Sequence, residues 1–133
     1  MVSYPDYDPS VWIKGVDQKT YENIQFSILP DPYWTVVHQG MTMVTQPGGT
    51  AVIPFQGFPY SIAAKTGTSQ QDIYANRKRF EIENATFVGY SPADNPKLAV
   101  AVVVPEGGFG SNSASYIARG IFDIYDKYVG LKQ

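Results

Sequence analysis

Apolar residues recur along this chain at two spacings, one typical of helices and one typical of strands. Asp31-Pro32 is a favourable helix start, because an Asp side chain can cap free N–H groups and Pro needs no donor at the first helical position. Pro47-Gly48-Gly49 is expected to end this helix, which would span about three turns. Its apolar residues lie three or four positions apart on one side: Trp34, Val37, Met41 and Val44.

A second helical pattern lies near the end of the sequence, and we expect this helix to lie across a sheet. Ser111 or Ser113 is the expected N-cap. A shorter helix is predicted from Asp17 through Gln25. The apolar members of the last helix share one face and are Ala114, Ile117, Ala118, Ile121, Tyr125 and Tyr128.

Strand-like patterns occupy the middle of the chain. Residues 60–64 alternate in polarity and lead into Lys65-Thr66-Gly67-Thr68, where we expect the strand to end. Residues 69–79 are polar and predict a loop. Residues 80–90 predict a second strand, in which Glu83-Asn84 can form a turn or bulge.

A third strand is predicted over residues 98–104, which are apolar at nearly every position and so indicate a central strand covered on both faces. Residues 1–10 predict a short edge strand that Pro5 and Pro9 interrupt. These elements give an α+β fold, an antiparallel sheet of about five strands at most, covered by helices. With 133 residues and 14.7 kDa, residues 1–133 fit a single domain.

The charge and composition of the chain exclude several classes of function and site. The net charge of −2, with no basic block, argues against binding to nucleic acid or an anionic membrane. The chain has no cysteine, which excludes disulfides and thiolate zinc sites, and it has a single histidine, His38, which we interpret as a packed residue. No cofactor or metal is expected. No apolar stretch reaches the roughly 20 residues of a membrane helix, and no signal pattern is present, so we expect a soluble monomer.

The run Lys65-Thr66-Gly67-Thr68 is the clearest catalytic signature in the chain. K-T-G is one of three motifs of serine acyltransferases, together with S-x-x-K and S-x-N or S-D-N. No lysine of this chain has a serine three residues before it, so S-x-x-K is absent. Ser111-Asn112-Ser113 contains Ser and Asn in the order S-N-S, and it follows the strands instead of preceding K-T-G, which favours a helix cap or loop.

Several ordered segments extend this similarity beyond the motif. The chain resembles the transpeptidase domain of class B penicillin-binding proteins, especially the penicillin-binding protein 2 group. Residues 2–9 look like the strand that opens that domain. Residues 37–41 and 47–51 look like the helix and turn before its K-T-G strand. Residues 85–92 and 98–104 look like the hairpin that follows.

One large departure accompanies the resemblance. In that family a long, mainly helical subdomain carrying S-x-x-K and S-x-N separates the opening strand from the segment that begins here near Ile28. We therefore infer an excision between about residues 15 and 29, which leaves the sheet subdomain without the all-helical one.

The resemblance implies roles for four residues and no complete catalytic set. Lys65, Thr66, Gly67 and Thr68 are expected to bind the carboxylate of a β-lactam or of a peptidoglycan stem peptide. The backbone N–H of Thr68 would be one oxyanion-hole donor, while the other donor belongs to the missing serine. On spacing alone, Lys65 also fits a solvated lysine at a strand end.

Three functional hypotheses follow. The first is a shortened D,D-transpeptidase that is catalytically inactive and binds β-lactam or peptide weakly and without a covalent bond. The family's members are membrane-anchored with an extracytoplasmic domain at the bacterial cell surface, whereas this chain carries no anchor pattern. The alternative is a non-enzymatic interaction or scaffold module that uses an exposed strand edge. An intact small enzyme with Lys65 as base has the least support.

The charged residues around position 80 are interpreted as a solvated face with weak ion pairs.

Overall fold

The computed structural model describes residues 31–75 and 77–132, which form an α+β arrangement. The predicted edge strand in residues 1–10, the predicted helix 17–25 and the proposed junction between 15 and 29 lie outside these residues. The described elements follow in the order α2 (Asp31–Met43), β1 (Ala63–Ala75), β2 (Lys78–Ser91), β3 (Leu98–Val104) and α3 (Ala114–Tyr128).

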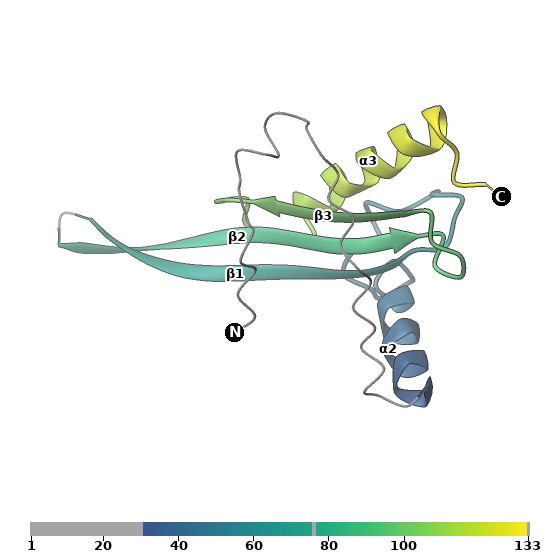
Figure 1. Ribbon diagram of the computed structural model, residues 1–133. Coiled ribbons are helices and arrows are strands. Elements are labelled where there is room, and N and C mark those ends of the chain that lie inside the picture. Colours follow the sequence, from purple (N-terminus) through teal and green to yellow (C-terminus); the bar gives the residue numbers. More distant parts are fainter. Residues whose placement is uncertain (1–30, 76, 133) are drawn as a thin grey trace, which may run out of the picture.

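The strands form one antiparallel sheet in the order β1-β2-β3, as Figure 1 shows. This confirms the predicted α+β class and the antiparallel meander. The expected number of about five strands is wrong for the described part of the chain, which has three.

Among the described residues β3 stands at one end of the strand order and one of its faces is exposed, so the prediction of a strand covered on both faces is wrong for this part of the chain. Val100 and Val102 are buried, while Ala99, Ala101 and Val103 point to the other face and are exposed. An unbroken apolar run is compatible with burial on both faces, but it does not show whether a second layer is present.

β1 and β2 form a hairpin that is longer than the sequence suggested. Pairing runs without interruption from Ala63 opposite Tyr90 to Ala75 opposite Lys78, so the predicted loop over residues 69–79 is wrong. The ladder also continues through Glu83 and Asn84, where a turn or bulge had been considered. Polar strand residues had been mistaken for a loop because their cross-strand partners were not visible in the local pattern.

β3 pairs only with residues 85–91 of β2, which divides the hairpin into two parts. We call residues 63–68 and 85–91, together with β3, the body. We call residues 69–75 and 78–84 the arm. In Figure 1 the arm extends past the end of β3 as a two-stranded ribbon.

The hydrophobic core lies on one face of the body. Phe87 of β2 stacks on Phe55 with 5.6 Å between ring centroids, and Phe122 of α3 packs edge-on against Phe55 at 6.2 Å. Phe87 and Phe122 are fully buried. α3 lies over β2 and β3, as predicted.

The buried side of α3 differs from the predicted stripe. Ala114 and Ala118 are buried as expected, but Ile117 and Tyr128 are 48% and 74% exposed. Phe122, which the stripe left out, is fully buried. The helix is therefore rotated relative to the stripe, because Phe122 fills the space beside Phe55.

α2 contacts the sheet through its second half. Trp34 and Val37 are 44% and 50% exposed, whereas Met41 is half-buried. The His38 ring stacks on Tyr90 at 6.1 Å, and its Nε2 lies 3.1 Å from the carbonyl oxygen of Ala93. This confirms the interpretation of His38 as a packed residue.

Candidate functional site

The K-T-G-T run lies inside β1 and not at its end. Because β1 is the first strand of the order β1-β2-β3, residues 65–68 lie on an edge of the sheet. In the described part of the chain no strand pairs with the outer side of β1, so the backbone donors and acceptors on that side have no strand partner among these residues.

Strand alternation divides the four side chains between the two faces. Lys65 is exposed and shares its face with its cross-strand partner Val88. The Lys65 amine donates a hydrogen bond to the carbonyl of Thr66. No carboxylate of the described residues forms an ion pair with it. The site therefore presents a cation that can accept an anionic ligand.

Thr66 points to the opposite face, towards the core. It is 8% exposed, and its hydroxyl lies 2.6 Å from that of Thr50. This bond fixes the segment after α2 to the K-T-G-T strand. Sequence analysis missed Thr50, because its partner lies 16 residues away and no local pattern signals the pair. Thr68 lies on the same face as Thr66 but is exposed.

Gly67 lies close to its cross-strand neighbour. A Cβ at this position would collide with Oγ1 of Thr86, which lies opposite in the ladder. The backbone of Gly110 approaches Gly67 and Thr86 so closely that a Cβ on Gly110 would overlap their carbonyl oxygens. Two glycines thus allow the link before α3 to pack directly on the K-T-G-T strand.

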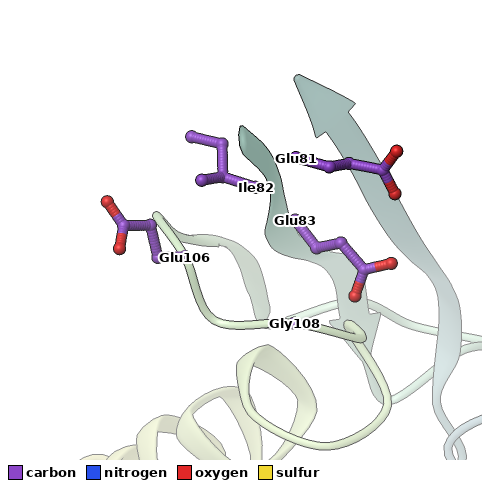
Figure 2. A pocket seen from close by; sticks show the side chains of 5 residues that line it. All are labelled: Glu81, Ile82, Glu83, Glu106 and Gly108. Carbon is purple, nitrogen blue, oxygen red and sulfur yellow. The ribbon is translucent and has the colours of Figure 1, made fainter. Parts of the chain in front are cut away.

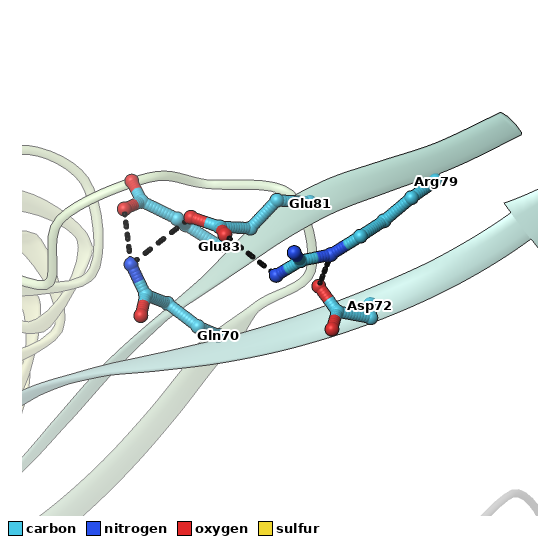
Figure 3. Close-up of polar contacts among 5 residues, drawn as sticks. All are labelled: Gln70, Asp72, Arg79, Glu81 and Glu83. Atoms are coloured by element: carbon cyan, nitrogen blue, oxygen red, sulfur yellow. Dashed lines mark hydrogen bonds and ion pairs between the residues drawn. The ribbon is translucent and has the colours of Figure 1, made fainter.

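A ladder of polar contacts covers one face of the arm (Figure 3). Nε of Arg79 lies 2.8 Å from Asp72, and its Nη2 lies 3.6 Å from Glu81. Gln70 donates hydrogen bonds to Glu81 and Glu83 at 3.2 and 3.3 Å. This confirms the predicted solvated charged face with ion pairs.

An open depression lies where the arm meets the link after β3. Figure 2 shows its lining residues, Glu81, Ile82, Glu83, Glu106 and Gly108. None of the K-T-G-T residues contributes to it. Within residues 31–75 and 77–132, no group of His, Cys, Asp or Glu side chains is arranged to hold a metal ion.

Ser111, Asn112 and Ser113 follow β3 and are not part of the K-T-G-T strand. The Ser111 hydroxyl bonds to Oδ1 of Asn112 at 3.2 Å. Ser113 occupies the N-cap position of α3, but its hydroxyl donates to the carbonyl of Gly107 at 2.9 Å instead of capping the helix. These serines therefore stabilise the link before α3.

A titratable contact joins α3 to the segment before β1. The Tyr60 hydroxyl donates a hydrogen bond to Oδ1 of Asp126 at 2.8 Å, and the same oxygen accepts the N–H of Leu131. This bond to a carboxylate, with smaller effects of burial and of the negative charge, raises the pKa of Tyr60 above its ordinary value.

An edge strand bearing K-T-G-T, backed by a C-terminal helix, is the arrangement expected of a penicillin-recognising acyltransferase. The family model of the penicillin-binding protein transpeptidase domain matches residues 3–123, and the chain belongs to this family. It is 37% identical over 101 residues to the peptidoglycan D,D-transpeptidase MrdA of Salmonella typhimurium, a match that covers 69% of this chain.

Solved structures show the same similarity. The structure of Pseudomonas aeruginosa PBP2 in complex with WCK 5153 matches 78% of this chain and 22% of its own, with a TM-score of 0.63 and 37% identity. Helicobacter pylori PBP2, in a complex with MreC, matches 75% of this chain and 18% of its own, with a TM-score of 0.59 and 25% identity.

The match covers only a small part of the relatives. The chain spans 16% of the length of the Salmonella transpeptidase. No helix among the described residues is both long enough and apolar enough to cross a membrane.

Proposed function

We propose that this chain is the sheet subdomain of a D,D-transpeptidase without its helical subdomain, forming one domain over residues 1–133. It binds a β-lactam or a peptidoglycan stem peptide non-covalently and transfers no acyl group. The observation that carries this proposal is the K-T-G-T run on an open sheet edge in a chain that lacks S-x-x-K. The site of action would be the bacterial surface where peptidoglycan is made, as for the D,D-transpeptidases that it resembles.

The free edge of β1 supports peptide binding. An extended peptide can add to such an edge, where main-chain hydrogen bonds supply affinity. Lys65 has no carboxylate partner among the described residues, so its amine is available for a ligand carboxylate. Thr68 is exposed on the opposite face of the strand, whereas the Thr66 hydroxyl already bonds to Thr50. We therefore assign binding to Lys65, Thr68 and the backbone around Gly67, and a supporting role to Thr66.

The missing serine determines the chemistry. Acyl transfer in this class needs a nucleophile, and the nucleophile also provides one of the two oxyanion-hole donors. With one cation and one donor, the site can orient a carboxylate or carbonyl but has nothing to attack it.

Amide chemical shifts followed during titration with benzylpenicillin, and separately with a stem pentapeptide, test this proposal. We expect rapid, saturable shifts centred on residues 65–68. The variant Lys65→Ala should weaken binding about tenfold or more, because a hydrogen bond to a charged group contributes about 1.5–3 kcal/mol. The control Lys97→Ala removes an exposed lysine outside the strand and should leave binding unchanged. Shifts centred elsewhere, or equal affinity in Lys65→Ala, would contradict the proposal.

A second candidate is an interaction module that adds a partner's strand to the β1 edge. Its support is that β1 and β3 are both edges of the described sheet. The H. pylori relative is found in a complex with MreC, so members of this family do bind other proteins. Displacement of the penicillin by an unrelated extended peptide would favour this candidate.

A further inference from the structure

One face of the sheet carries exposed apolar side chains in the body and again in the arm, with the polar residues Ser69, Asn84 and Thr86 between them. The ladder register places them on the same side, opposite to the core. Val103 and Phe80 are 67% and 51% exposed, and Val88 is 48% exposed. We call this surface the open face. Its members are Lys65, Val88, Ala101 and Val103 in the body and Ile73, Phe80 and Ile82 in the arm.

The arm has the composition of a half-buried ribbon. Its other face carries the polar ladder of Arg79, Asp72 and Glu81, while the open face carries the Ile73 and Phe80 pair. Such alternation is typical of a sheet with one covered face. A two-stranded ribbon without cover is marginally stable in water. The link after β3 contacts the arm at its base, where the N–H of Glu106 bonds to Asn84 and Glu106 lines a depression with Ile82. Further along the arm, Ile73 and Phe80 are 39% and 51% exposed, which argues for a covering partner.

We propose that a second copy of this chain covers the open face. The apolar part of the arm and that of the body lie on the same side of the same two strands, one after the other. Consider a two-fold axis that lies between two facing sheets, parallel to their planes and at right angles to the strands. This axis would place each arm over the body of the other copy. Val88 would then face Phe80 of the second copy, and the contact would occur twice in a closed dimer.

Side-chain sizes and charges fit this arrangement. The large Phe80 would cover the smaller Val88 and the adjacent Ala101, as in interdigitating sheets about 10 Å apart. The aliphatic part of Lys65 would lie on Ile73 of the second copy, and its amine would reach water at the β1 edge. α2 covers only the Tyr90 end of this face, through His38, and leaves the rest accessible.

The available area is sufficient for a weak dimer. A 13-residue strand is about 44 Å long, and two to three strands are about 10–14 Å wide, which gives about 500 Å² on each copy. The total of about 1,000 Å² is near the lower limit for specific interfaces, so we expect a concentration-dependent dimer.

Sedimentation of the full chain over a range of concentrations tests the dimer against the monomer expected from the sequence. The wild type should approach twice its monomer mass at high concentration. Phe80→Lys and Val88→Glu should each remain monomeric. An equimolar mixture of these two variants should recover a dimer, because one of its two contacts becomes a Lys–Glu pair and the other keeps Val88 and Phe80. Ile124→Lys, a control on the exposed side of α3, should sediment like the wild type.

Three results would overturn the dimer. They are a wild type that stays monomeric at every concentration, a control that disrupts association as much as Phe80→Lys does, and a mixture that does not associate. If the wild type is monomeric and Phe80→Lys also lowers its melting temperature strongly, the open face is covered within one chain instead. Should Phe80→Lys not fold, Ile73→Ser tests the neighbouring contact with Lys65 in the same interface, with the same expected loss of the dimer.

Discussion

The arm and the body consist of the same two strands, yet different interactions hold them. In the body, Phe87 is fully buried between Phe55 and the sheet, and α3 covers the layer. In the arm, Phe80 is 51% exposed, and cross-strand pairs and the Arg79 ladder provide the contacts. Continuous hydrogen bonding along a strand therefore does not imply uniform stability, because burial differs between its two ends.

The sharpest test of this comparison replaces one phenylalanine in each region. Phe87→Ala should lower the free energy of unfolding by about 3–5 kcal/mol, because it leaves a cavity in a packed core. Phe80→Ala should cost less than about 1 kcal/mol in the monomer, because the ring is half in water. Urea unfolding at low protein concentration measures both. Equal losses would contradict the division into body and arm.

A glycine substitution tests how closely the body is packed. Gly110→Ala should lower the free energy of unfolding by about 2 kcal/mol or more, because its Cβ would overlap backbone oxygens of Gly67 and Thr86 that cannot rotate away. The matched control is Gly40→Ala in α2, where a Cβ meets no atom within 4 Å. It should raise stability by about 0.5–1 kcal/mol. A neutral Gly110→Ala would show that the link before α3 does not pack on β1.

The contact between Tyr60 and Asp126, which joins α3 to the segment before β1, makes the stability of the fold depend on pH. The pKa of Tyr60 is raised in the folded state, so the folded chain binds this proton more tightly than the unfolded chain. The stabilisation is complete below the unfolded pKa of Tyr, about 10, and is lost as pH rises through the folded value. Thermal melts between pH 8 and 11 should show a decline that Tyr60→Phe reduces. An identical decline in the variant would assign it to other groups.

The smallest effect is expected in the arm. Arg79→Ala removes contacts to Asp72 and Glu81, whose side chains are 41% and 50% exposed. Such pairs contribute about 0–1 kcal/mol and are screened by salt. The difference in unfolding free energy from the wild type should shrink further in 1 M NaCl. A loss as large as that of Phe87→Ala would mean that the arm is held by its charges.

Local sequence patterns predicted most helices and strands, but not how far the strands pair or which of their faces are covered. The start of α2, the bounds of β3 and the presence of α3 follow from capping residues, apolar runs and helical spacing. The continuation of β1 past Thr68 was missed, because Gln70 and Asp72 are stabilised by Glu83, Glu81 and Arg79 on the other strand. The exposure of one face of β3 was missed because an apolar run does not show whether a second layer covers it.

The sequence motif of the candidate site was predictable, but the positions of its side chains were not. The K-T-G-T motif identified Lys65 and Thr68, and the structure places both on an accessible edge strand. The separate position of Thr66, bonded to Thr50, could not be read from the motif, because it depends on how the segment after α2 packs. Likewise, Gly67 is explained by Thr86 and Gly110, which are distant in sequence.

The central claim is that this transpeptidase-like sheet has a binding edge but no nucleophile, and the intact mass of the protein after incubation with benzylpenicillin tests it most directly. We predict an unchanged mass after prolonged incubation under native conditions, while the amide shifts of residues 65–68 still report binding. A stable increase in mass by one penicillin, mapped to a serine of this chain, would contradict the account.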